Sequence, residues 1–120
     1  MDIVRHIING AEIAEAARTG QVFDPATGQV SKQVAFASTA EVDRAIAAAA
    51  SALPAWRETS LIKRADVFFR LRQLLKERTP ELAAIVTSEH GKVLSDAAGE
   101  VSRGIENVEF AAGLVHLLKG

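Results

Sequence analysis

Apolar residues in the first third of the chain occur in short runs that are separated by turn residues. Ile7-Ile8 precedes Asn9-Gly10, and Val22-Phe23 precedes the turn sequence Asp24-Pro25-Ala26-Thr27-Gly28. Asn-Gly between apolar runs is a strong hairpin signal, because both residues tolerate positive φ. With a further strand expected over residues 30–36, this part of the chain is predicted to form a small β ribbon.

The expected strand 30–36 alternates in a way that suggests one buried face. Its residues on one side are Val30, Lys32, Val34 and Phe36. The segment from Ala11 to Gly20 matches no such pattern, and its alanine and glutamate content hints at a helical turn between strands.

From Ser38 the apolar period becomes helical. Ser38-Thr39-Ala40-Glu41 has the form of a capping box, so a helix is predicted from about Thr39 to Leu53, with Pro54 as its stop. A second helix should begin near Ser60, with one apolar stripe formed by Leu61, Ala65, Phe68, Leu71 and Leu75.

Two more helices are expected after residue 78. Thr79 is predicted as an N-cap followed by Pro80 at the first helical position, and this helix should end at Gly91 in a left-handed conformation. Ser95 is the expected cap of the last helix, which should continue to Leu117 or Leu118.

The last helix has an unusual composition between Gly99 and Gly113. One stripe is apolar, whereas a different face carries Gly99, Arg103, Glu106, Asn107 and Phe110. Each interior glycine costs about 1 kcal/mol relative to alanine. Gly99 and Gly104 flank Arg103 and would let a ligand or another backbone come close, so this position suits an anion-binding arginine.

Composition and charge narrow the function classes. The chain has 120 residues, a formal net charge of -1 and no cysteine. The near-neutral charge favours neither nucleic acid nor an anionic membrane as a partner. The lack of cysteine excludes a disulfide framework, a thiolate zinc site and a thiol nucleophile within these residues. No apolar run reaches the ~20 residues of a membrane span. A cytoplasmic protein is expected, with the mitochondrial matrix after removal of a transit peptide as the alternative.

Four motifs together resemble the aldehyde dehydrogenase superfamily. They are Asp24-Pro25-Ala26-Thr27-Gly28, Pro54-Ala55-Trp56-Arg57, Glu89-His90-Gly91-Lys92 and the stretch from Gly99 to Gly113. The last one, Gly-Glu-Val-Ser-Arg-Gly-Ile-Glu-Asn-Val-Glu-Phe-Ala-Ala-Gly, is similar to that of the CoA-acylating methylmalonate-semialdehyde dehydrogenases. The resemblance covers essentially the whole chain and corresponds to the amino-terminal quarter of such enzymes.

The resemblance implies an α/β parent enzyme, of which this chain is an amino-terminal fragment. Residues 1–120 would be part of the NAD-binding domain, with a β ribbon over 1–37 and three to four packed helices over 38–120, and the catalytic and oligomerisation domains would be absent. The apolar end from Leu114 onward is likewise expected to continue into further chain.

The reaction implied for the parent is oxidation of malonate or methylmalonate semialdehyde. A cysteine thiolate attacks the aldehyde, NAD takes the hydride and CoA takes the acyl group, with loss of CO2 to give acetyl-CoA or propionyl-CoA. These are steps of valine and inositol breakdown. Since this chain has no cysteine, it is predicted to be inactive alone and to bind no cofactor alone, and its NAD and CoA contacts are left unassigned. The parent is expected to be a homo-oligomer.

Arg103 is the one substrate-binding residue that the resemblance indicates, because the arginine at this point of the motif lines the substrate tunnel. A guanidinium grips a carboxylate with two parallel hydrogen bonds. The alternative is a surface arginine that pairs with Glu100 or Glu106. Those two acids are expected to be ordinary helix-surface residues, Asn107 to bond a ligand or a loop, and Phe110 to pack.

The remaining polar and aromatic residues favour structural roles. His6, His90 and His116 lack metal-site spacing, so no metal is expected. The basic segment from Arg57 to Arg78 is interpreted as the solvated face of an amphipathic helix. Trp56 is expected in the core, and the Gly91-Lys92 pair at a turn rather than on a phosphate.

Two other functions stay open. One is a noncatalytic helical interaction module that associates through exposed apolar faces, and the other is a fragment of a general NAD-dependent aldehyde dehydrogenase. Replacement of Arg103 by leucine would separate the second from a semialdehyde-specific enzyme.

Overall fold

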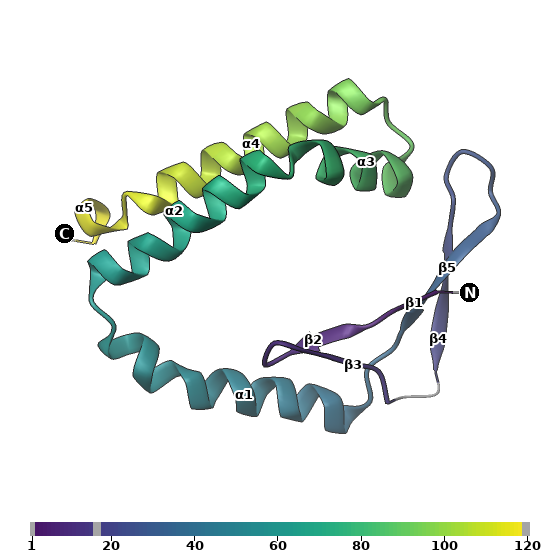
Figure 1. Ribbon diagram of the computed structural model, residues 1–120. Helices are drawn as coiled ribbons and strands as arrows, with labels where there is room; N and C mark the ends of the chain where they lie inside the picture. The colour runs from purple at the N-terminus through teal and green to yellow at the C-terminus, as the bar shows by residue number, and fades with distance from the viewer. Residues whose placement is uncertain (1, 16–17, 119–120) are drawn as a thin grey trace. The chain divides into compact units, whose positions relative to one another are not determined.

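The computed structural model describes residues 2–15 and 18–118 and contains short strands followed by helices (Figure 1). The strands are β1 (Ile3–Val4), β2 (His6–Ile8), β3 (Ala11–Ile13), β4 (Thr19–Phe23) and β5 (Val30–Ala35), and the helices are α1 (Thr39–Glu58), α2 (Leu61–Glu77), α3 (Thr79–His90), α4 (Leu94–Ala112) and α5 (Leu114–Leu117). The expected fold class of a β ribbon followed by packed helices is confirmed.

Contacts divide the chain into two compact units, Met1–Glu58 and Thr59–Gly120. α1 belongs to the first unit with all the strands, because it contacts β2. The compact units therefore part after α1. The placement of residues 1–120 in an NAD-binding domain stays a prediction.

β2 and β3 form the predicted hairpin. They pair antiparallel, with Ile8 opposite Ala11, and Asn9 and Gly10 make the turn. Asn9 has φ 51° and Gly10 has φ 76°, the two positive values that a type I′ turn requires. Asparagine and glycine adopt these angles at low cost, which is why this hairpin follows from local sequence.

The other sheet has the order β1-β5-β4. β4 and β5 are antiparallel around the predicted turn, where Asp24 accepts hydrogen bonds from the backbone N–H groups of Ala26 (2.8 Å, side chain) and Gly28 (2.8 Å, carbonyl). β1 pairs parallel to β5, with Ile3 opposite Gln33. No local sequence pattern predicted this pairing, because two parallel strands that pair in a sheet must be joined by a long connection.

The helical turn suggested between Ala11 and Gly20 is wrong where the structure describes it. Residues 11–13 form β3 and residues 19–20 begin β4, while residues 16 and 17 lie outside the described residues. Hydrogen bonding to β2 and β5 overrides the helical preference of alanine and glutamate.

The most buried position of β5 lies on the side opposite Val30, Lys32 and Val34. Ala35, on the other side, is 3% exposed, whereas Phe36 is 44% exposed. The Phe36 ring lies over Gly20 of the neighbouring strand and carries the Arg18 guanidinium 5.6 Å from its centroid. It therefore packs along the strand pair rather than beneath a covering layer.

α1 begins as predicted and ends later than predicted. Ser38 and Glu41 form the capping box: the Glu41 carboxylate accepts from Ser38 N–H (2.7 Å) and the Ser38 hydroxyl accepts from Glu41 N–H (3.2 Å). Pro54 lies inside the helix, which continues to Glu58, so its role as a stop is wrong. Trp56 consequently lies on this helix and is 43% exposed, not in the core.

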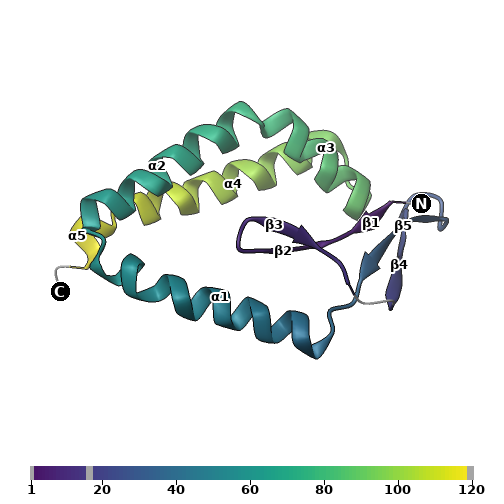
Figure 2. The same ribbon diagram turned by 60° about the horizontal axis from the view of Figure 1, so that its bottom comes forward.

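The second unit packs α2 and α3 against α4. Figure 1 and Figure 2 both show α2 and α4 running side by side. The buried residues at these contacts are mostly small: Ala65, Ala83, Ala97, Ile105 and Ala112. Small side chains let helix backbones approach closely, and the expected α4 stripe faces inward through Ile105 and Ala112.

Three predicted helix ends in this unit can be compared with the structure, and one of them is confirmed. Thr79 is not an N-cap, because its hydroxyl donates to the Leu75 carbonyl (2.9 Å) while Arg78 holds the cap position. Gly91 ends α3 with φ 85°, as predicted, and its N–H bonds to the Thr87 carbonyl (2.8 Å). Ser95 is not a cap, since Val93 holds that position before Leu94.

The last helix does not continue to Leu117 or Leu118 as one element. α4 ends at Ala112, the Gly113 N–H bonds to the Phe110 carbonyl at 3.1 Å, and α5 follows. The i to i+3 bond tightens the last turn and interrupts the helical ladder.

Within the described residues, no helix combines the length and the apolar character that crossing a membrane requires.

Candidate functional site

Arg103 lies in the middle of α4 on the face opposite the packed stripe. Its side chain is 71% exposed, while Ile105 two positions later is 8% exposed. A Cβ built on Gly99 or Gly104 meets no atom within 4 Å in the described part of the chain. The helix surface around Arg103 is therefore open, and a ligand can approach it.

Glu100 is the acid nearest to Arg103, yet it is bonded to another cation. Its Oε1 atom accepts from Lys92 Nζ at 2.5 Å and lies 3.9 Å from Arg103 Nη2. The hydrogen bond from Lys92 is the main reason that the pKa of Glu100 lies below its ordinary value, and the Lys92 and Arg103 charges add to the effect. Lys92 is thus the principal partner of Glu100.

The expected equivalence of Glu100 and Glu106 does not hold. Both acids stand three positions from Arg103, but among the described residues only Glu100 makes an ion pair with it. Glu106 is exposed. The sequence could not separate the two acids, because Lys92 reaches Glu100 only through the turn between α3 and α4.

Asn107 and Phe110 share the exposed side of α4 with Arg103. The Asn107 side-chain amide donates to the Arg103 carbonyl at 3.0 Å, a bond within the helix. Phe110 is 71% exposed, so its expected packing is not made within this chain. Arg103 and Phe110 stand seven positions apart, a spacing that puts them on the same helix face.

Lys92 occupies the turn after Gly91, as expected for a structural role. Its side chain is only 18% exposed, and its ammonium is bonded to Glu100. This carboxylate partner supports the structural reading of Gly91-Lys92 over phosphate binding. Sequence analysis missed the partner because no short-range pattern joins residues eight positions apart across a helix boundary.

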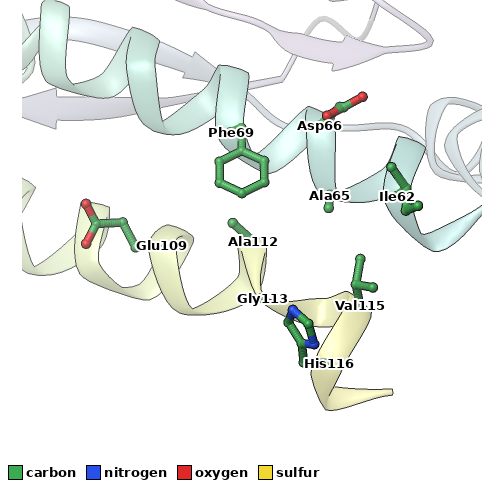
Figure 3. Close-up of a pocket in the computed structure, with 9 residues that line it drawn as sticks. All are labelled: Ile62, Ala65, Asp66, Phe69, Glu109, Ala112, Gly113, Val115 and His116. Carbon is green, nitrogen blue, oxygen red and sulfur yellow. The ribbon is translucent and has the colours of Figure 1, made fainter. Parts of the chain in front are cut away.

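A cavity of about 400 Å³ lies between α2 and the end of α4, and Arg103 is not among its lining residues (Figure 3). Its lining residues are Ile62, Ala65, Asp66, Phe69, Glu109, Ala112, Gly113, Val115 and His116. The Glu109 carboxylate is paired with Arg72 at 2.5 Å. None of these nine lining residues carries the hydroxyl of serine or threonine or the thiol of cysteine.

The first unit holds a buried carboxylate that sequence analysis assigned only to helix capping. Glu41 is 1% exposed, and besides Ser38 N–H its carboxylate accepts from Glu15 N–H at 2.8 Å. These two backbone hydrogen bonds, that from Glu15 first, lower the pKa of Glu41 to about 2. The segment after β3 and the start of α1 thus meet at one carboxylate.

His6 lies beside Glu41 in a cavity of about 350 Å³ whose other lining residues are mostly apolar. Its Nε2 atom is buried without a hydrogen-bond partner among the described residues. In the described ranges 2–15 and 18–118, no group of three histidine, cysteine, aspartate or glutamate side chains is arranged to hold a metal ion.

The cavity against α1 is lined by Ile7, Ile8, Asn9, Ala45, Ala48, Ala49 and Ala52, without a charged group. A pyrophosphate needs cations or converging backbone N–H groups, and a ribose needs a polar acceptor. The lining of this cavity supplies no cation for a pyrophosphate.

Comparison with known proteins gives a consistent family. The aldehyde dehydrogenase family model matches residues 13–120. Malonate-semialdehyde dehydrogenase from Pseudomonas aeruginosa is 44% identical over 120 residues, an alignment that covers 100% of this chain and 24% of that protein.

Solved structures of similar proteins share the fold. Methylmalonate-semialdehyde dehydrogenase from Oceanimonas doudoroffii matches with a TM-score of 0.97 and 48% identity, over 100% of this chain and 25% of that one. A protein described as a methylmalonate-semialdehyde dehydrogenase from Sinorhizobium meliloti 1021, complexed with NAD, matches with a TM-score of 0.95 and 40% identity, over 99% and 24%. The chain spans about a quarter of the length of these relatives and belongs to the aldehyde dehydrogenase family.

Proposed function

We propose that this chain is part of an enzyme that oxidises malonate semialdehyde or methylmalonate semialdehyde with NAD and CoA. The products would be acetyl-CoA or propionyl-CoA, CO2 and NADH. The names of similar proteins support the substrate class, and the complex of one of them with NAD supports the hydride acceptor. Decarboxylation and acyl transfer to CoA rest on the motif from Gly99 to Gly113.

The observation that carries the proposal is the open guanidinium of Arg103. Both semialdehydes bear a carboxylate, and a planar guanidinium binds a carboxylate through two parallel hydrogen bonds. Arg103 is 71% exposed, and its nearest acid is 3.9 Å away and bonded to Lys92. Its role is to hold the substrate carboxylate and so to orient the aldehyde. An aldehyde without a carboxylate cannot make this interaction.

Covalent chemistry belongs to other parts of the enzyme. The reaction class requires a thiolate that attacks the aldehyde, and the 120 residues contain no cysteine. NAD, when bound, accepts the hydride. The isolated chain therefore has no dehydrogenase activity, and turnover of malonate semialdehyde by the purified chain with NAD and CoA would contradict this statement.

The test is Arg103→Leu in the complete enzyme that contains this chain. If the pair of Arg103 and the substrate carboxylate is buried in the complete enzyme, the value of kcat/KM for malonate semialdehyde should fall by a factor that corresponds to about 2 to 5 kcal/mol, because the carboxylate loses its partner. The value for propanal, which has no carboxylate, should change little. Arg70→Leu, at an exposed position of α2, is the matched control.

Equal losses for both aldehydes in Arg103→Leu would favour a general packing role. Equal efficiency of the wild-type enzyme toward both substrates would favour the general aldehyde dehydrogenase instead. Arg103→Lys adds a geometric test, since lysine keeps the charge but cannot donate two parallel hydrogen bonds. It should recover only part of the lost kcat/KM.

The complete enzyme is also proposed to be a homo-oligomer and to act in the cytoplasm. Large side chains such as Ile46 (62% exposed) and Phe110 (71% exposed) leave apolar surface uncovered within this chain. Sedimentation of the complete enzyme as a single subunit would contradict the first proposal. The relatives described above are bacterial, so the mitochondrial alternative gains no support.

A further inference from the structure

Two cations share the single carboxylate of Glu100, and they share it unequally. Oε1 of Glu100 lies 2.5 Å from Lys92 Nζ and 3.9 Å from Arg103 Nη2. Only the first distance is that of a direct charge-assisted hydrogen bond. Arg103 is left with a weak second contact to an oxygen that already has a donor.

The exposures of the three side chains fit this inequality. Lys92 is 18% exposed, Glu100 41% and Arg103 71%. Charges that are less exposed are less screened by water and salt, so the Lys92 bond is the stronger of the two. The turn that carries Lys92 is held by Gly91, whose φ of 85° suits glycine.

The positive charge of Arg103 is not neutralised by Glu100. The group formed by Lys92, Glu100 and Arg103 carries one net positive charge, and the shorter distance pairs the Glu100 carboxylate with Lys92. Glu100 and Arg103 are three positions apart on one helix, the spacing at which such side chains pair readily. Without Lys92, the Glu100 carboxylate would therefore turn to Arg103 and occupy the donors that a substrate needs.

We propose that Lys92 is a positioning residue that withholds Glu100 from Arg103, so that the Arg103 guanidinium makes no direct hydrogen bond to Glu100 and presents its donors to a carboxylate-bearing substrate. The inference rests on the proposed function for its substrate. It differs from a role in which Glu100 holds Arg103 in place, because the two roles predict opposite effects when Glu100 is neutralised.

The experiment compares four variants of the complete enzyme with malonate semialdehyde and propanal as substrates. Lys92→Met removes the cation, Lys92→Arg keeps it, Glu100→Gln removes the competing carboxylate, and Lys92→Met/Glu100→Gln combines the two changes. Lys76→Met, on the exposed surface at the end of α2, is the control for loss of a lysine.

Lys92→Met should raise KM for malonate semialdehyde about 2- to 5-fold, the range expected when an exposed ion pair competes for the arginine. KM for propanal and kcat for both substrates should stay near the wild-type values. In Lys92→Arg and Lys76→Met, KM and kcat for both substrates should also stay near the wild-type values. Glu100→Gln and the double variant should bind malonate semialdehyde at least as tightly as the wild type.

Two kinetic results would overturn the inference. One is a rise in KM for malonate semialdehyde in Glu100→Gln, which would make Glu100 a support for Arg103. The other is a Lys92→Met defect that affects propanal equally or persists in the double variant, which would make Lys92 a purely structural residue.

A crystal structure of Lys92→Met supplies a readout without substrate. The Glu100–Arg103 separation should shorten from 3.9 Å to about 2.8 Å. An unchanged separation would overturn the inference whatever the substrate is. A shortened pair in an enzyme that does not prefer malonate semialdehyde would instead refute the proposed function and leave the withholding role standing.

Discussion

The Glu41 carboxylate accepts a hydrogen bond of 2.8 Å from the backbone N–H of Glu15, although 26 positions separate the two residues. The same carboxylate caps α1 through Ser38. The segment after β3 is thereby tied to the first turn of α1, and a carboxylate that is 1% exposed gains the donors that burial demands.

The first prediction concerns pH. Hydrogen bonds to its charged form lower the pKa of Glu41 from the ordinary 4.5 to about 2. A lowered folded-state pKa contributes stability above pH 4.5 and loses it as the pH falls toward about 2, because the unfolded state takes up the proton first. Urea unfolding between pH 6 and about 2 should show this decline in the free energy of unfolding.

Glu41→Gln removes the titrating group and should flatten that part of the pH profile. It should also speed hydrogen exchange at the Glu15 and Ser38 amides, since an amide side chain offers one acceptor oxygen instead of two. Glu12→Gln, on an exposed position of β3, is the matched control. An unchanged profile in Glu41→Gln would show that other carboxylates cause the acid loss.

The second prediction concerns the two glycines beside Arg103. Because a Cβ at Gly99 or Gly104 meets no atom of residues 2–15 and 18–118 within 4 Å, alanine at either position should stabilise α4 by about 0.8 to 1 kcal/mol. Thermal unfolding measures the change. The same substitution at Gly91 should be destabilising by about 1 to 2 kcal/mol, because its φ of 85° is left-handed.

Activity of the complete enzyme tells whether these glycines serve ligand approach. If the substrate passes close to the helix, Gly104→Ala should lower kcat/KM for malonate semialdehyde while raising Tm. A rise in Tm without any loss of kcat/KM would leave close approach without support at this position.

The third prediction concerns Gly20 and Phe36. A Cβ at Gly20 would lie 2.5 Å from Cζ of Phe36, so Gly20→Ala must displace the ring. The cost should be about 1 kcal/mol, at the low end of the range for overpacking, because the ring is 44% exposed and its far end makes the clash.

A double-mutant cycle isolates this contact. In a Phe36→Leu background, Gly20→Ala should cost clearly less than it does in the wild type, with urea unfolding as the measurement. Equal costs in both backgrounds would place the penalty in the strand backbone instead of the ring.

The fourth prediction concerns Pro54. This proline lies inside α1 and has no N–H to donate to the carbonyl four positions earlier. Pro54→Ala should restore that hydrogen bond and stabilise the helix by up to about 3 kcal/mol. Circular dichroism during thermal unfolding should give a higher Tm, with Ala52→Gly as a destabilising control in the same helix.

Local chemistry determined the elements whose signals lie within a few residues. Asn9 and Gly10 adopt the positive φ angles of a hairpin turn, Ser38 and Glu41 exchange capping bonds, and Gly91 ends α3 in the left-handed region. Each depends on backbone geometry or a short side chain, so composition and spacing suffice to predict it. The inward stripe of α4 follows in the same way from helical periodicity.

Tertiary structure decided what depends on residues far apart in the chain. The parallel pairing of β1 with β5, the Glu15–Glu41 bond and the Lys92–Glu100 pair all join segments across turns or long connections. Pro54 also shows the limit of local prediction. It is a helix-stop signal in the sequence, yet α1 continues past it to Glu58.

For the candidate site, the resemblance of the motif from Gly99 to Gly113 selected Arg103, and the period of an α-helix put it on a face apart from the core. The sequence treated Glu100 and Glu106 alike, since both stand three positions from the arginine. Only the fold distinguished them: the turn at Gly91 brings the Lys92 ammonium to Glu100, and Coulomb attraction falls with distance, so the nearer cation holds the carboxylate.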